Sequence, residues 1–343
     1  MTSFALTLGC ALLAFSPSLS VLLLFAYSKA QLVIIVTTAS FFQLLSCLLS
    51  ALLHLPFKSL SLGAQDIFII IPTSVLSQAF ARCAFVHCYH KVEAVIQKSI
   101  RRHELQNRRS SQSQSDQNGN GNQSDDDEPT ESEQLQLELN DASSGIAAGV
   151  GFAFFHTVML YGTLLASENS RMGTLYQDSC TIMPSIFNSA IMAFFFGIMD
   201  IIWVLMTFYG MRRIQLSKTN VIGNTSYISS GDTNVNRNNN ANVNSPTSYS
   251  RNEQQASNEQ LWTVQRDNTG GKAILVLVVL THFAAAFATI PNQTMALNGC
   301  VVALPSLAFV AMVTVAVFFI FCKKNYLPKV QQQQRIRQDD HLD

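Results

Sequence analysis

The sequence AFFFGIMDIIWVLM, residues 193–206, is apolar on both sides of a single aspartate, Asp200. It belongs to a longer apolar run, residues 182–209. A helix that spans a bilayer needs about 20 mostly apolar residues, so this run is long enough to cross a membrane. Six further runs of this kind are present, at residues 3–26, 31–54, 67–90, 144–166, 273–292 and 298–322.

The composition agrees with a membrane location. The chain has 343 residues, of which 48% are hydrophobic and only 13% are charged, whereas about a quarter of the residues of a soluble domain are charged. The apolar residues gather in long blocks separated by polar stretches, which is typical of a polytopic membrane protein. The predicted fold is therefore all-α, a bundle of seven transmembrane helices.

The placement of lysine and arginine predicts the orientation of these helices. Basic residues gather after the third, fifth and seventh runs, while the other side of the membrane holds only Lys58 and Arg171. Cytosolic loops carry the excess of basic residues, so the N-terminus is expected to be lumenal or extracellular and the C-terminus cytosolic. The N-terminus lacks the basic region of a cleaved signal peptide, so the first run is expected to remain as a helix.

Two of the predicted cytosolic segments are long and rich in Asn, Gln and Ser, with too few large apolar residues to fold alone. They are interpreted as disordered insertions. The predicted organisation is residues 1–97 for transmembrane helices 1–3, 98–142 for a disordered cytosolic loop, 143–210 for helices 4 and 5, 211–271 for an Asn-rich disordered cytosolic loop, 272–323 for helices 6 and 7, and 324–343 for a cytosolic tail.

Three ionisable residues, Arg82, Asp200 and His282, lie inside apolar runs, each roughly 14–18 Å from the cytosolic boundary at 1.5 Å per residue. That depth is close to the middle of a hydrocarbon core about 30 Å thick. A buried charge there costs about 2.5–3.5 kcal/mol or more, so pairing is expected. We predict that Asp200 accepts hydrogen bonds from His282, from Arg82 or from both, and that Gln78, one turn from Arg82, joins them.

Two other interpretations of these residues stay open. Arg82 could extend its charged end toward the cytosolic surface, and Asp200 with His282 could form a proton relay.

No His, Cys and Asp cluster has the spacing of metal ligands, so neither a metal nor a cofactor is predicted. Most cysteines lie inside apolar runs and are expected to be small core residues. Cys180 and Cys300 lie at or beyond the edges of runs, so a disulfide between them is possible.

The fourth run begins with SSGIAAGVGFAFF, residues 143–155, in which Gly145, Gly149 and Ala153 recur every four residues on one helix face. Small residues at this spacing let two helix backbones approach closely. The pattern fits packing within this chain, and it fits docking of a partner's helix equally well.

Several motifs in a fixed order resemble those of one membrane family. The first run carries the pattern G-C-A-x-x-A-F-x-P from Gly9 to Pro17, and the second contains ASFFQLLSCLLSALL. The third run places Gln78 four residues before Arg82, the fourth has the small residues named above, and the sixth contains LTH, ending at His282. In this order the motifs resemble the Aph (anterior pharynx-defective) subunits of γ-secretase.

The chain departs from that family at two positions. The family's third helix has a Gln-Glu-x-x-Arg pattern, and Ala79 stands here where the glutamate is expected. Its fifth helix has a histidine before x-x-Trp, and Asp200, in DIIW, takes that place. A His–His pair is thus replaced by an Asp–His pair, which keeps a polar contact and changes its charge.

The resemblance implies a non-catalytic scaffold in the bilayers of the endoplasmic reticulum, Golgi and plasma membrane. Such a subunit binds nicastrin and stabilises presenilin and the small presenilin enhancer, in a protease that cleaves Notch-type and amyloid-precursor-type substrates. No nucleic-acid partner is predicted. Independently of the resemblance, an aspartyl dyad needs two carboxylates that share a proton, and the predicted spans hold one aspartate, Asp200.

A stand-alone seven-helix receptor or transporter is the alternative. A receptor is disfavoured because the third run ends in HCYHK, residues 87–91, in place of an acidic-Arg-Tyr triplet, and because the last run lacks Asn-Pro-x-x-Tyr. A transporter would suit charges at the membrane midplane, but the seven runs show no inverted-repeat symmetry.

Overall fold

The computed structural model describes residues 4–27, 29–58, 66–115, 141–164, 180, 182–228, 268–293 and 298–323. Nearly all residues in these ranges are helical, which confirms the all-α prediction. The long helices are α1 (Phe4–Val21), α2 (Ala30–Lys58), α3 (Asp66–Ser115), α5 (Asp141–Thr157), α7 (Ser185–Ile228), α9 (Asn268–Ala288) and α10 (Gly299–Phe318). Short helical turns cover Leu22–Ala26, Val158–Gly162, Ile290–Gln293 and Phe319–Lys323.

Six helical stretches within the described residues are long and apolar enough to cross a membrane, which makes this a multi-pass membrane protein. They are Ala5–Phe25, Ala30–Pro56, Ala142–Gly162, Ser185–Gln215, Gly270–Asn292 and Gly299–Phe321. The remaining predicted run, residues 67–90, lies inside α3. That helix carries both apolar and charged residues, and it runs on far beyond the run itself.

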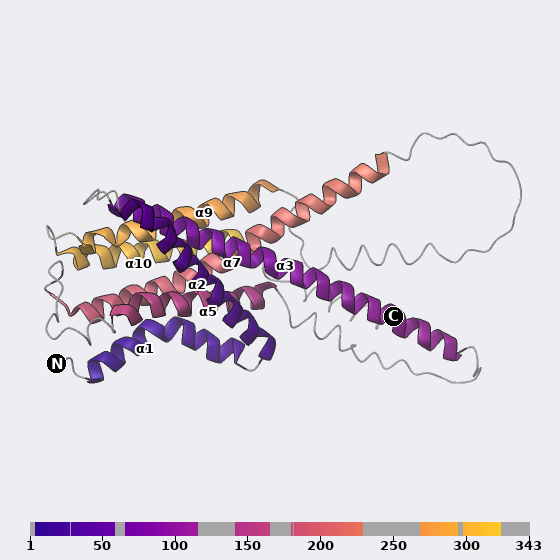
Figure 1. Cartoon of the computed structure of the whole chain (residues 1–343), viewed down its shortest axis with the longest axis horizontal. Coiled ribbons are helices and arrows are strands. Elements are labelled where there is room, and N and C mark those ends of the chain that lie inside the picture. The colour runs from indigo at the N-terminus through magenta and orange to yellow at the C-terminus, as the bar shows by residue number, and fades with distance from the viewer. Residues whose placement is uncertain are drawn as a thin grey trace, which may run out of the picture.

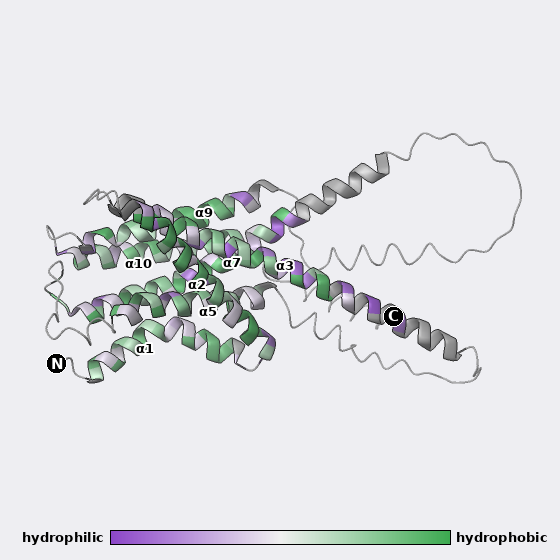
Figure 2. Cartoon of the chain, in the orientation of Figure 1, coloured by the Kyte–Doolittle hydropathy of each residue, from purple (hydrophilic) through white to green (hydrophobic). Residues whose placement is uncertain are grey.

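The helices lie side by side in one bundle, and α3 and α7 extend past the others at one end (Figure 1). The bundle is predominantly hydrophobic, whereas hydrophilic residues become frequent on α3 and α7 where they leave it (Figure 2). This division matches a membrane-embedded bundle with two projecting helices.

Both projecting helices pass the boundaries predicted for the disordered loops. α3 continues to Ser115, into the segment 98–142, and α7 continues to Ile228, into the segment 211–271. Much of residues 91–109 is Lys, Arg, Glu, Gln and Ala, which are good helix formers. Adding residues to a helix that the bundle has already nucleated is inexpensive, so these residues continue it. The rest of both loops, 116–140 and 229–267, and the tail 324–343 lie outside the described residues.

α5 and α7 form the centre of the bundle. In each of them 61% of the most apolar window is buried, compared with 17–28% in the other four candidate spans. α7 contributes to all three apolar clusters of the core, packing against α2, α3 and α5 on one side, against α9 and α10 on another, and against α1 on a third. The buried polar residues of α5 and α7, among them His156 and Asp200, therefore face other helices and not lipid.

Candidate functional site

The central polar contact joins Arg82 of α3 to Asp200 of α7. The Arg82 Nη2 atom lies 2.5 Å from Asp200 Oδ1, and each side chain is only 1% exposed. Arg82 therefore points into the bundle, so the alternative in which it extends toward the cytosolic surface is wrong. This contact answers how a carboxylate is held within the apolar sequence AFFFGIMDIIWVLM.

A second histidine, His156 of α5, completes the coordination of the carboxylate. His156 Nδ1 lies 2.6 Å from Asp200 Oδ2. An ionised carboxylate only accepts hydrogen bonds, so His156 donates from Nδ1. Sequence reasoning missed His156, although the signal was present: like the other three residues, it is an ionisable group inside an apolar run.

His282 of α9 reaches the network through Arg82. Arg82 Nη1 lies 3.1 Å from His282 Nδ1, and because a guanidinium only donates, this ring nitrogen accepts. The His282 ring stacks on Trp203 of α7, with centroids 4.3 Å apart, and the Arg82 guanidinium carbon lies 5.1 Å from the centre of the Trp203 ring. Trp203 Nε1 in turn donates to Thr281 Oγ1 at 2.9 Å.

The structure thus brings the four predicted residues together, with differences in detail. Within the described part of the chain, Asp200 is bonded to Arg82 and His156. His282 is bonded to Arg82 and not to Asp200 itself. Gln78 is a marginal member, because its Oε1 atom lies 3.5 Å from Arg82 Nη2, at the long limit of a hydrogen bond. The proton-relay interpretation remains a hypothesis.

The network fastens four helices at one level. Asp200 and Trp203 come from α7, Arg82 from α3, His156 from α5 and His282 from α9. Removing charges from water is costly, and their mutual attraction offsets that cost only when their hydrogen bonds are satisfied. Here one cation faces one anion, and both carboxylate oxygens are bonded, while Arg82 Nε is buried without a hydrogen-bond partner among the described residues. The arrangement suits a structural role, since the pair is neutral and shielded on every side.

The small residues of α5 pack helices within this chain. A Cβ atom placed on Gly149 would lie 2.8 Å from Ile201 Cα of α7, and one on Gly145 would lie 3.0 Å from Leu205 Cδ2. Ala153 is fully buried. The chain's own helices bury these three residues, which supports packing within this chain. Docking of a partner's helix on this stripe stays a prediction.

Gly151, which was not singled out from the sequence, faces α2 on another side of α5. A Cβ atom there would overlap the carbonyl oxygen of Val36 and would lie 2.9 Å from Ala39 Cβ. Ser40 Oγ donates to the Gly151 carbonyl oxygen at 3.0 Å. Two glycines two residues apart thus let α5 lie close to α7 and to α2 at the same height.

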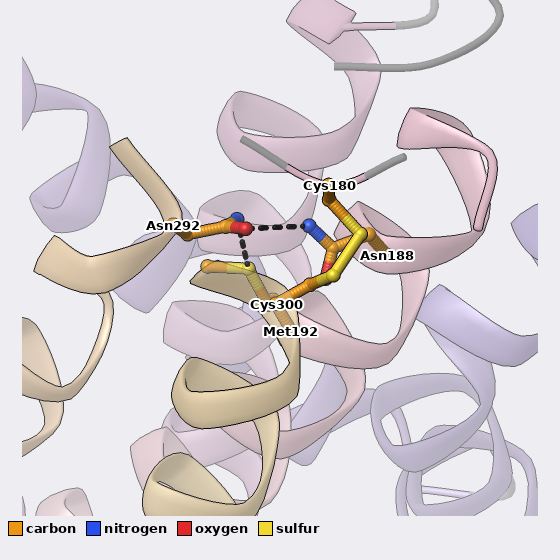
Figure 3. Close-up of a disulfide and its surroundings, with 5 residues drawn as sticks. All are labelled: Cys180, Asn188, Met192, Asn292 and Cys300. Atoms are coloured by element: carbon orange, nitrogen blue, oxygen red, sulfur yellow. Dashed lines mark hydrogen bonds between the residues drawn. A yellow bond between two sulfur atoms is a disulfide. The ribbon is translucent and has the colours of Figure 1, made fainter. Parts of the chain in front are cut away.

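A disulfide between Cys180 and Cys300 closes the opposite end of the bundle from the projecting helices, with the two Cα atoms 5.5 Å apart. Beside it, Asn188 Nδ2 donates to Asn292 Oδ1 at 3.0 Å, and Asn292 Nδ2 lies 3.3 Å from Met192 Sδ (Figure 3). The pairing that the sequence left open is therefore present. It ties the segment before α7 to the first turn of α10.

Comparison with known proteins identifies the family of this chain. A family model described as Aph-1 protein matches residues 5–251, well over half of the sequence. The chain belongs to the Aph-1 family. No curated protein sequence matches it. Aph-1 membership supports a role as a subunit of γ-secretase.

The Aph-1 match covers α1 to α7 and thus includes Arg82, His156 and Asp200. α9 and α10 lie beyond its end, and so does His282. The carboxylate with its two direct partners therefore lies within the matched region, while the stacking of His282 on Trp203 connects that region to the rest of the bundle.

The disulfide makes a prediction that protein chemistry can check. We expect Cys180 and Cys300 to resist alkylation until the protein is reduced, whereas the exposed Cys88 reacts without reduction. Replacing Cys180 and Cys300 by serine should lower the free energy of unfolding by about 2–4 kcal/mol, since the bond closes a long loop. Peptide mapping with and without reductant measures the first effect, and denaturation in mild detergent the second. A free thiol at Cys300 in unreduced protein would contradict the pairing.

Proposed function

We propose that the chain is a non-catalytic scaffold and assembly subunit of the γ-secretase intramembrane aspartyl protease. In this role it stabilises presenilin and nicastrin, together with the presenilin enhancer, and so supports cleavage of Notch-type and amyloid-precursor-type substrates. The observation that carries the proposal is the Aph-1 family match over residues 5–251. It favours a subunit of a complex over a stand-alone receptor or transporter.

The geometry around Asp200 supports the non-catalytic part of this proposal. An aspartyl protease needs two carboxylates close enough to share a proton, with access to substrate. The Asp200 carboxylate is buried, and its two oxygens are engaged by Arg82 and His156. A carboxylate held in this way is suited to fastening helices and not to attacking a peptide bond.

The disulfide supports the proposed orientation. Disulfides persist in the secretory lumen and outside the cell, and are rare in the cytosol. The bundle end that carries Cys180 and Cys300 is therefore proposed to face the lumen. The opposite end, where α3 and α7 project with their basic residues, then faces the cytosol, as the distribution of lysine and arginine also requires. We place the protein in the endoplasmic reticulum, Golgi and plasma membrane.

The test is affinity purification of the tagged full-length chain in a gentle detergent, followed by mass spectrometry of the proteins that accompany it. We expect presenilin, nicastrin and the presenilin enhancer in constant proportion to the chain. A chain recovered alone from cells that express all three would contradict the proposal. Nucleotide-sensitive association with a G protein would favour the receptor alternative, and substrate flux in liposomes holding this chain alone would favour the transporter.

A further inference from the structure

α3 leaves the bundle with a face that this chain does not cover. Val92, Val95 and Ile96 are 57%, 68% and 42% exposed, and they lie just beyond the predicted membrane run. Lys91, Lys98 and Arg102 are also exposed. These six residues are called the α3 interfacial face.

The helix period places these residues on one side of α3. Positions 91, 95, 98 and 102 follow the spacing i, i+4, i+7 and i+11, which returns to the same stripe of an α-helix. Val92 and Ile96 lie about 100° and 140° around the helix from Lys91 and form a separate apolar flank between the stripe and the opposite side. The opposite side of the helix is held inward, since Glu93 accepts from Arg212 of α7 at 2.6 Å. α3 therefore presents a fixed outer face that is basic along one edge and apolar along the other.

The depth of this face matches the lipid headgroups. Arg82 pairs with Asp200, the middle residue of the candidate span Ser185–Gln215, and therefore lies near the middle of the hydrocarbon core. Lys91 follows Arg82 by nine residues, about 14 Å along the helix, which is close to half the hydrocarbon thickness. Val92 to Ile96 then lie at the level of the headgroups. Side chains of a helix lean toward its N-terminus, so Lys98 and Arg102 lean back toward the membrane. The Lys98 stem can lie along Val95, one turn earlier, and both long side chains can extend their charges toward the phosphates.

We infer that the α3 interfacial face binds anionic phospholipid headgroups of the cytosolic leaflet, and so anchors the base of the projecting helix. The inference rests on the orientation given with the proposed function. Basic residues immediately cytosolic of a transmembrane helix attract anionic lipids of that leaflet. Within the part of the chain that the structure describes, Lys91, Lys98 and Arg102 form no ion pair, so their charges are available to phosphates. If these basic residues served only to set the orientation of the helices in the membrane, the apolar residues on the same face would have no role.

The experiment uses the full-length chain in phosphatidylcholine nanodiscs that contain a trace of spin-labelled phosphatidylserine. Electron paramagnetic resonance measures the fraction of labelled lipid that the protein immobilises, and hence its preference for phosphatidylserine over phosphatidylcholine. We expect a preference that falls severalfold in the variant with Lys91→Gln, Lys98→Gln and Arg102→Gln, because each basic residue near an anionic surface contributes up to roughly fivefold. The preference should also weaken with added salt.

Two control variants separate this face from charge in general. Lys91→Arg with Lys98→Arg keeps the charge and should keep the preference. Lys272→Gln removes one exposed charge from the start of α9, outside this face, and should lower the preference much less than the triple variant does. The inference is overturned if the triple glutamine variant prefers phosphatidylserine as strongly as the natural chain, or if Lys272→Gln alone lowers the preference as much as the triple variant does. Both nanodisc leaflets have the same composition, so an error in the proposed orientation or partners would leave this measurement unchanged.

Discussion

Replacing Asp200 with alanine is expected to lower the free energy of unfolding of the helix bundle by about 3–5 kcal/mol, because it leaves a buried guanidinium without its counter-charge. The Arg82 side chain is 1% exposed and cannot reach water without moving α3 away from α7. His156 loses its acceptor at the same time. Denaturation in mild detergent measures the loss. The yield of the purified complex should fall with it, since an unpaired charge in this position opposes close packing of four helices.

A double variant distinguishes an electrostatic cause from a loss of packing. Combining Asp200→Leu with Arg82→Met removes both charges and keeps most of the volume, and replacing a buried pair in this way is often neutral. We therefore expect the double variant to recover most of the stability that Asp200→Ala loses. If the double variant is as unstable as the single one, the ion pair is not the reason for the loss.

Glu93→Gln serves as the matched control for this experiment. Glu93 and Arg212 also join α3 to α7, at 2.6 Å, but their side chains are 17% and 21% exposed. Because this pair keeps some contact with water, we expect Glu93→Gln to cost less than Asp200→Ala, on the order of 1 kcal/mol. The contrast between the two pairs on the same two helices would show that burial, and not the presence of an ion pair, sets the size of the effect.

The depth of the polar residues could be predicted from the sequence, and their pairing could not. Counting 1.5 Å per residue from the charged boundaries placed Arg82, Asp200 and His282 at one level. Which of them touch depends on how α3, α7 and α9 are rotated about their axes. The structure sets Arg82 between Asp200 and His282, an order that no linear spacing encodes. His156 would have been found by applying the same count to the fourth run.

The sequence left the partner of the small residues open for a related reason. The stripe of Gly145, Gly149 and Ala153 correctly marks a face of close helix approach, but the sequence does not say whose helix approaches. In the structure α7 of the same chain covers Gly149. Gly151 lies two residues away, outside the stripe, and makes the tighter approach, to α2. A four-residue pattern identifies one face of a helix. A central helix such as α5 is in close contact with other helices on several of its faces.

Gly151→Leu is expected to have the second large effect, a loss of stability exceeding the roughly 1–3 kcal/mol that overpacking usually costs. A Cβ atom at this position meets the backbone of α2, at the carbonyl oxygen of Val36, and a backbone cannot move aside as a flexible side chain can. Even Gly151→Ala should be destabilising, and it should weaken the hydrogen bond from Ser40 to the Gly151 carbonyl. Denaturation in mild detergent measures the free energy of unfolding of both variants.

Gly9→Ala in α1 is the matched control, and its effect should have the opposite sign. A Cβ atom on Gly9 would meet nothing within 4 Å, and alanine is favoured over glycine inside a helix by about 0.5–1 kcal/mol. A neutral or stabilising Gly9→Ala beside a destabilising Gly151→Ala would show that close approach of α2 and α5, and not helix propensity, governs Gly151. If Gly151→Ala is as harmless as Gly9→Ala, the two helices are not held at this separation, and the central place of α5 in the bundle would need to be reconsidered.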